Sequence, residues 1–216
     1  LDMRYFDFHY KPWMPSRKLC RLFGGRPRKA DEPVTQRHKD IAAALQQKTE
    51  EMLMAIIEHA RKETGMHNLC LAGGVALNSV ANGKILRETG FKDLWIQPAA
   101  GDSGNAIGAA LLLHHKLVDA PRSRQETAYS GPSFGDAQIK SFLDSHFLKY
   151  THCTTKTELI KKVARLIYDN NVVGRFQGRM EWGPRALGAR SILSNPCNQK
   201  MQDILNLKVK HREKFR

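Results

Sequence analysis

Patterns for paired metal ligands and for disulfides are missing from this sequence. Its four cysteines, Cys20, Cys70, Cys153 and Cys197, include no Cys-x-x-Cys pair, and no two of its nine histidines are four residues apart. The cysteine spacing gives no disulfide framework, and no histidine pair would share one face of a helix. We therefore expect free, buried thiols and a cytoplasmic protein.

Long apolar runs of membrane length are also absent, as are recognisable secretion and lipidation signals. Acidic residues are scarce: 21 Asp and Glu face 35 Lys and Arg, for a net charge of +14. The basic residues are spread along the chain instead of forming one stripe, which argues against nucleic-acid binding. We expect no membrane partner, and we expect the charge to attract anionic small substrates.

Two glycine-rich turns follow short apolar runs, at Gly73-Gly74 and around Gly101. The spacing predicts two strand–turn–helix units, with strands over 69–72 and 94–96 and helices over 76–87 and 105–117. Two successive units of this kind indicate a parallel sheet with right-handed crossovers, in which ligands bind at the carboxyl ends of the strands. Both turns are therefore expected to face one cleft.

Glycine turns of this type suit anion binding, because glycine lets backbone N–H groups approach a ligand and a helix start adds unpaired donors. The alternative is a tight turn that only packs a helix on a sheet. Asp102 lies inside the second turn, where its carboxylate would either cap the following helix or hold a cation. Ser103 could serve as the cap instead.

A long helix is predicted over 36–63, with Thr35 as its N-cap and Gly65 as its end. Its apolar residues recur at helical spacing and predict a core face, formed by Ile41, Leu45, Met52, Ile56 and His59 or Ala60. Residues 1–31 are predicted to be irregular, with one short helix over 16–22.

Residues 118–136 are rich in proline, glycine and arginine and predict an exposed connection between two modules. Helices are predicted beyond it over 137–145 and 158–169, and a strand over 172–177.

That strand leads into a loop with three arginines, Arg179, Arg185 and Arg190, stiffened by Pro184. Guanidinium groups bind phosphate and carboxylate oxygens at two points, so three of them converging would hold a doubly charged ligand. Glu181 is placed to orient one of them. The alternative is a set of surface arginines paired with the acidic residues Glu181, Asp203 or Glu213.

Five segments together closely resemble the O-carbamoyltransferases of nodulation-factor and antibiotic biosynthesis. They are residues 1–7 (LDMRYFD), 32–42 (EPVTQRHKDIA), 70–78 (CLAGGVALN), 97–102 (QPAAGD) and 176–188 (FQGRMEWGPRALG). The resemblance implies an α/β protein in which the C-terminal lobe of an actin/Hsp70-like ATPase domain precedes part of a YrdC-like domain. By this resemblance residues 1–125 belong to the first domain, residues 126–216 belong to the second, and the chain is a fragment.

The resemblance also implies a reaction. The YrdC-like part would form carbamoyl adenylate from carbamoyl phosphate and ATP, and the first domain would transfer the carbamoyl group to a hydroxyl of a small-molecule or glycan acceptor. The catalytic residues expected for the first step are Arg179, Arg185 and Arg190. The residues expected to bind ATP or the adenylate are Gly73, Gly74, Val75, Asn78, Gly101 and Ser191.

A metal is the last feature that the resemblance implies. In the family an aspartate at the position of Asp102 binds a divalent metal, expected to be iron, together with a His-x-x-x-His pair that this sequence lacks. Magnesium is expected to accompany ATP.

Two other functions remain open from the sequence. A sugar-kinase-like ATPase would release ADP without carbamoyl phosphate, whereas the carbamoyltransferase would release AMP only in its presence. A basic module related to tRNA-modification proteins would bind tRNA with a steep dependence on salt. The sequence does not fix the oligomeric state.

Overall fold

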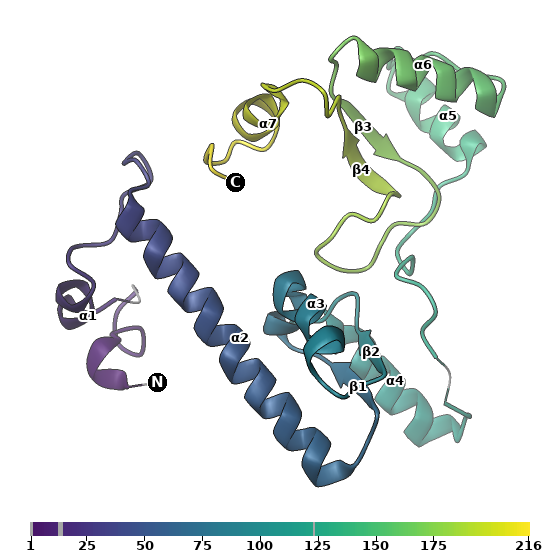
Figure 1. The fold of residues 1–216 in the computed structure, drawn as a ribbon. Helices are drawn as coiled ribbons and strands as arrows, with labels where there is room; N and C mark the ends of the chain where they lie inside the picture. Colours follow the sequence, from purple (N-terminus) through teal and green to yellow (C-terminus); the bar gives the residue numbers. More distant parts are fainter. Residues whose placement is uncertain (1, 13–14, 123) are drawn as a thin grey trace. The chain divides into compact units, whose positions relative to one another are not determined.

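The computed structural model describes residues 2–12, 15–122 and 124–216, and it is a mixed α/β structure (Figure 1). Its tertiary contacts divide the chain into two units. Unit 1 comprises residues 1–67 and 83–91, and unit 2 comprises residues 68–82 and 92–216. None of the described helices combines the length and the apolar character that a bilayer span requires.

Unit 1 is largely helical and contains η1 (Met3–Tyr5), α1 (Arg17–Leu22) and α2 (Gln36–Thr64). α2 begins and ends where the sequence predicts. The backbone N–H of Thr35 donates to Nδ1 of His38 at 3.0 Å, and Gly65 follows the helix with a φ of 65°. A left-handed residue of this kind ends a helix by turning the chain out of it, and glycine adopts it without steric cost.

The core of unit 1 corrects the predicted apolar face of α2. Ile57 is 2% exposed and joins Ile85 and Phe91 in the core, whereas Leu45, Met52 and Ile56 are all more than 60% exposed. Each residue turns an α-helix by about 100°, so the adjacent residues Ile56 and Ile57 lie on different apolar stripes of α2. The spacing of the apolar residues identifies these stripes, but it does not tell which of them is buried.

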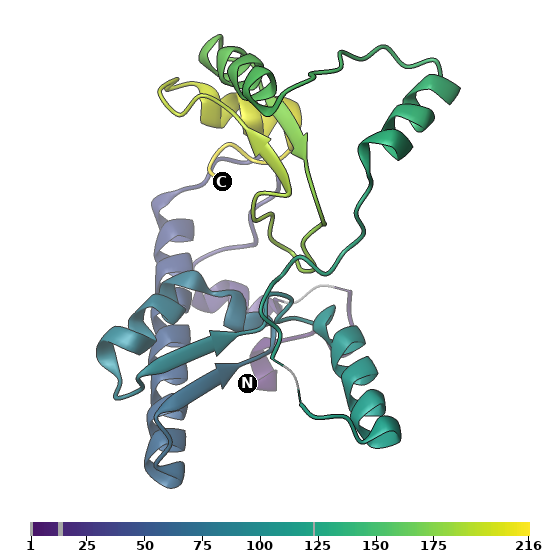
Figure 2. The same cartoon turned by 90° about the vertical axis from the view of Figure 1, so that its right-hand side faces the viewer.

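Unit 2 contains the predicted parallel strands, β1 (Asn68–Leu71) and β2 (Asp93–Ile96), with Leu69 opposite Leu94. Figure 2 shows their arrows pointing the same way. The second strand leads into α4 (Gly104–Val118), close to the predicted helix.

The first predicted helix, over 76–87, is corrected in its first turn. The chain instead forms a 3₁₀ turn, η2 (Gly74–Leu77), and the α-helix α3 begins later (Ser79–Glu88). The cause is Asn78, whose Oδ1 accepts the N–H of Ala81 at 3.2 Å and starts a new helix. Asparagine is a strong N-cap, so it divides the segment in two.

The prediction of buried thiols is also corrected. All four cysteines are free, but Cys70 and Cys197 are exposed and Cys20 and Cys153 are half-buried. Cys70 lies on β1, where exposed and half-buried residues alternate. One face of this strand is therefore uncovered.

The remainder of unit 2 begins with a connection at residues 119–135, whose described residues form no helix or strand. It was expected to be exposed, yet Ala128 and Gly131 are buried. The elements that follow are α5 (Asp136–Ser145), α6 (Lys156–Tyr168), β3 (Val173–Phe176), β4 (Arg190–Leu193), α7 (Met201–Ile204) and the π-helical turn η3 (Leu205–Val209).

The strands β3 and β4 form an antiparallel pair, with Val173 opposite Leu193. α6 contacts β3. The sequence did not reveal β4, so Arg190 and Ser191, expected in a loop, lie in a strand. Because β4 pairs with β3, the residues between the two strands form a loop that returns the chain to β3.

Candidate active site

The two glycine-rich turns lie side by side in unit 2. The backbone N–H of Gly73 donates to the carbonyl oxygen of Ala100 at 2.7 Å. Ala99 and Ala100 are 0% and 5% exposed, so the second turn is packed firmly at this point. The bond occupies the N–H of Gly73, which therefore holds the turns together and has no donor left for an anion.

Open donors remain beside this bond. The N–H groups of Gly74 and Val75 make no hydrogen bond with the described residues, and neither does that of Gly101. A Cβ built at Gly74 or Gly101 would meet no atom within 4 Å, so there is free space next to these donors. Unpaired donors at the start of a helical turn attract an anion. The donors at this turn are therefore open to an anionic ligand.

Asn78, predicted to bind the adenylate, has a structural task at one atom. Its Oδ1 caps α3 through the N–H of Ala81. This cap fixes the residue at which α3 begins.

Asp102 does not cap α4. Its side chain is exposed and makes no hydrogen bond or ion pair within the part of the chain that the structure describes, and the N-cap residue Ser103 makes no side-chain bond either. The carboxylate is therefore available to a ligand. The same described residues contain no group of three His, Cys, Asp or Glu side chains that could hold a metal ion. One carboxylate does not complete a metal site.

Glu181 organises the loop that carries the arginines. It is 2% exposed, and its Oε1 accepts the N–H groups of Leu187 at 2.6 Å and Ala189 at 2.8 Å. Its Oε2 lies 3.3 Å from Nε of Arg190, so the predicted contact between Glu181 and one of the arginines is present. Burial raises the pKa of Glu181, but the backbone donors outweigh it and lower the pKa to about 2.

The three arginines have different surroundings. Arg190 is half-buried, with Nη2 bound to the carbonyl oxygen of Gly183 and Nε beside Glu181. Arg179 is exposed, and its Nε donates to the carbonyl oxygen of Gly131 at 3.1 Å. Arg185 is exposed and has no partner among the described residues. Arg185 is therefore the arginine most open to a ligand, whereas Arg190 shapes the loop.

Ser191, also predicted to bind the nucleotide, closes the loop. Its Oγ accepts the N–H of Gly188 at 3.1 Å. Gly188 has a φ of 112°, a conformation that glycine adopts more readily than other residues.

The arginine loop meets the second glycine turn. Gly183 has a φ of 134°, and a Cβ built on it would lie 2.6 Å from the carbonyl oxygen of Pro98. Only a residue without a side chain allows this approach. Pro98 begins the turn whose residue Ala100 binds Gly73. All three predicted motifs therefore adjoin the short segment 98–100.

Sequence reasoning missed the segment 128–132, which pairs with the start of the loop. The N–H of Trp182 donates to the carbonyl oxygen of Ala128 at 2.7 Å, and the N–H of Gly131 donates to that of Met180 at 2.9 Å. The hydroxyl of Tyr129 donates to the carbonyl oxygen of Leu187 at 2.8 Å. Gly131 is the one residue of the sequence that points to this pairing, because a Cβ there would lie 2.7 Å from Cβ of Met180.

Two family models match the chain. Residues 1–111 match "Carbamoyltransferase N-terminus" and residues 164–216 match "Carbamoyltransferase C-terminus".

Relatives match over most or all of the chain. It is 46% identical to "Uncharacterized protein sll1178" of Synechocystis sp. over 222 residues, covering 100% of this chain and 36% of that protein. It is 40% identical to "Nodulation protein NolO" of Bradyrhizobium diazoefficiens over 190 residues, covering 88% of this chain and 35% of that protein. It is 40% identical to "Nodulation protein U" of Rhizobium fredii over 156 residues, or 70% of this chain and 24% of that protein.

The chain thus spans between 24% and 36% of the length of these relatives. The matches to the two family models and the identity across the whole chain agree with one another. This chain belongs to the carbamoyltransferase family.

Proposed function

We propose that this chain forms part of an ATP-dependent O-carbamoyltransferase. Family membership supports carbamoyl transfer. The observation that carries the proposal is the convergence on segment 98–100, where Gly73 binds Ala100 and Gly183 packs on Pro98. A phosphate cradle and an arginine loop that adjoin one segment can serve the same substrate.

The proposed reaction has two steps. Carbamoyl phosphate, ATP and water give carbamoyl adenylate, pyrophosphate and phosphate. The oxygen of an acceptor hydroxyl then bonds to the carbamoyl carbon, AMP leaves, and the hydroxyl proton passes to solvent. The acceptor in this proposal is a small molecule or a glycan, and the enzyme works in the cytoplasm.

In the first step Arg185 binds the phosphate of the carbamoyl donor, with the terminal guanidinium nitrogens of Arg179 beside it. Guanidinium groups that already stand where charge develops stabilise the transition state without reorganising. Glu181 and Arg190 contribute by holding the loop in shape, because both are committed to contacts within it. Ser191 contributes in the same way through Gly188.

In the second step the open N–H groups of Gly74, Val75 and Gly101 bind the phosphate of the adenylate. Binding at this phosphate positions the carbamoyl carbon for attack and favours AMP as the leaving group. Asn78 holds the start of α3 behind this cradle.

A divalent metal, with iron as the expected ion, would take Asp102 as one ligand, and magnesium would accompany ATP. Asp102 offers a free carboxylate, but the described residues do not complete a metal site around it. When bound, such an ion would polarise the carbamoyl group. The two steps above therefore rest on the backbone donors and the arginines alone.

The proposed architecture is the C-terminal lobe of an actin/Hsp70-like ATPase domain over residues 1–125, followed by part of a YrdC-like domain over residues 126–216. The parallel pair β1–β2, with a glycine turn after each strand, supports an ATPase-type lobe.

The test is ATP–pyrophosphate exchange, measured for this chain and, in parallel, for the longer relative NolO of Bradyrhizobium diazoefficiens. We expect exchange only when carbamoyl phosphate is present, with AMP as the final nucleotide product. Release of ADP without carbamoyl phosphate would contradict the proposal and indicate a kinase. Exchange at the same rate with and without carbamoyl phosphate would also contradict the proposal.

A further inference from the structure

A second cationic site lies in unit 1, which contains none of the residues assigned above to the carbamoyl-transfer site. A cavity of about 910 Å³ is lined by residues of α1, of the segment before it and of the turn at Gly24 and Gly25 after it. Four cationic side chains line it, Lys11, Arg17, Arg21 and Arg26, together with the single carboxylate of Asp7. This volume is that of a small-molecule site and exceeds the need of a bare ion.

Two of the four cations are already neutralised. Nζ of Lys11 lies 2.9 Å from Oδ2 of Asp7, whose Oδ1 accepts the hydroxyl of Tyr10 at 2.6 Å. Arg26 forms an ion pair with Glu32. Asp7, the only carboxylate among the described residues that line the cavity, is therefore occupied.

Arg17 and Arg21 remain without an acceptor in the described part of the chain. They are four residues apart on α1, so their side chains leave the same face of the helix, and their like charges repel each other. Lys11 adds a third positive charge to the cavity. Its hydrogen bond with Asp7 raises the pKa of Lys11, whereas the positive charge of Arg17 lowers it. An anion placed between Arg17 and Arg21 would relieve the repulsion.

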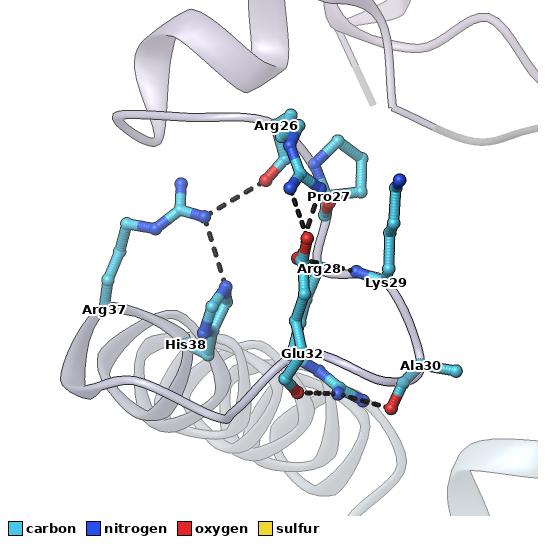
Figure 3. Close-up of polar contacts among 8 residues, drawn as sticks. All are labelled: Arg26, Pro27, Arg28, Lys29, Ala30, Glu32, Arg37 and His38. Carbon is cyan, nitrogen blue, oxygen red and sulfur yellow. Dashed lines mark hydrogen bonds and ion pairs between the residues drawn. The ribbon is translucent and has the colours of Figure 1, made fainter.

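The wall of the cavity is held in place from outside it, as Figure 3 shows for Arg26, Glu32 and Arg37. The guanidinium of Arg37, at the start of α2, donates to the carbonyl oxygens of Phe23 at 2.9 Å and Arg26 at 3.1 Å. Gly25 has a φ of 157°, and a Cβ there would lie 2.8 Å from Nη1 of Arg37. The turn after α1 is thus fixed before any ligand binds.

The base of α1 is fixed as well. Ser16 is 6% exposed, its Oγ accepts the N–H of Leu19 at 3.1 Å, and its own N–H donates to the carbonyl oxygen of Tyr5 at 3.2 Å. A site whose walls are ordered in advance loses less entropy on binding.

We propose that this cavity binds a phosphorylated small molecule, with its phosphate group held between Arg17 and Arg21. Two guanidinium groups one helical turn apart match the oxygens of a phosphate ester, which each can bind at two points. The remaining volume accommodates the organic part of the ligand. The proposal does not depend on the carbamoyl-transfer reaction.

The test is arginine footprinting of the unmodified protein with phenylglyoxal, read out peptide by peptide by mass spectrometry. Glucose 1-phosphate and inorganic phosphate, at millimolar concentrations, are expected to protect Arg17 and Arg21, and glucose is expected to protect neither. Arg4 and Arg87, exposed arginines of the same unit, are the controls. No protection, or equal protection of all four residues, would overturn the proposal.

Variants give a second measurement. Arg17→Gln and Arg21→Gln are each expected to weaken binding of glucose 1-phosphate about tenfold in isothermal titration. Arg87→Gln removes the same charge from unit 1 outside the cavity and is expected to leave the affinity unchanged. Equal weakening by Arg87→Gln would show a general charge effect and would overturn the assignment.

Discussion

Oε2 of Glu181 lies 3.3 Å from Nε of Arg190, and the carboxylate side chain is fully shielded from solvent. Neither atom has a hydrogen-bond partner in the described structure, so this contact is an electrostatic one. The other carboxylate oxygen binds the backbone of the loop at Leu187 and Ala189. The negative charge of Glu181 therefore supports the shape of the loop that carries Arg185.

Acid should destabilise the protein through Glu181. Its pKa falls from the ordinary 4.5 to about 2 in the folded state. Because the unfolded chain then binds the proton more readily, the stabilising contribution is complete above about pH 4.5 and is lost as the pH falls toward 2. The melting temperature of Glu181→Gln should therefore drop less between pH 5 and pH 2 than that of the unmodified protein, because Glu181 titrates within about this range.

Thermal unfolding followed by circular dichroism measures this difference. At pH 7 Glu181→Gln should already melt several degrees lower, because the half-buried guanidinium of Arg190 loses its counter-charge. Glu126→Gln, a change at an exposed carboxylate, is the matched control. Parallel pH profiles for Glu181→Gln and the unmodified protein would refute the assigned role.

Gly183→Ala should separate the arginine loop from the second glycine turn. The new Cβ would meet the Pro98 oxygen at 2.6 Å, and the backbone already has a φ of 134°. The expected loss in the free energy of unfolding is about 1–3 kcal/mol, with loss of pyrophosphate exchange. Gly178→Ala is the control, because Gly178 also has a positive φ, 70°, but no atom within 4 Å. Equal losses in the two variants would mean that backbone strain and not the contact with Pro98 matters.

The two parallel strands and the ends of α2 were predictable because local chemistry decides them, whereas β4 was not predicted. Thr35 and Gly65 mark the ends of α2, and the glycine turns after β1 and β2 mark a parallel pair. The start of α3 was predicted wrongly, because Asn78 caps a helix inside an otherwise helical pattern. A local cap outweighed the apolar spacing there.

The candidate site was only partly predictable. The sequence identifies the glycines and arginines by type and spacing, and it places Glu181 near an arginine. It does not reveal that Ala128 pairs with Trp182 or that Gly183 packs on Pro98, because these contacts join segments more than 50 residues apart. Such pairings depend on tertiary packing, which no local pattern records.

Arg185→Ala should abolish carbamoyl-phosphate-dependent pyrophosphate exchange with little effect on stability. Its side chain is exposed and has no partner among the described residues, so its removal breaks no contact of the fold. The melting temperature measures the second part. Arg165→Ala, which removes an exposed arginine of α6 paired with Asp169, is the control and should keep the exchange rate. Exchange at the normal rate in Arg185→Ala would show that this arginine does not bind the donor.

Neighbouring residues of α2 allow a direct test of the core. Ile57 is 2% exposed and Ile56 is 63% exposed, although both are isoleucines in the same helix. Ile57→Ala should lower the free energy of unfolding in urea by about 2–5 kcal/mol, because a cavity remains in a packed core. Ile56→Ala should change it by less than about 0.5 kcal/mol, since alanine loses no packing there and favours the helix. A larger loss for Ile56→Ala than for Ile57→Ala would mean that the stripe of Leu45, Met52 and Ile56 is the covered face of α2.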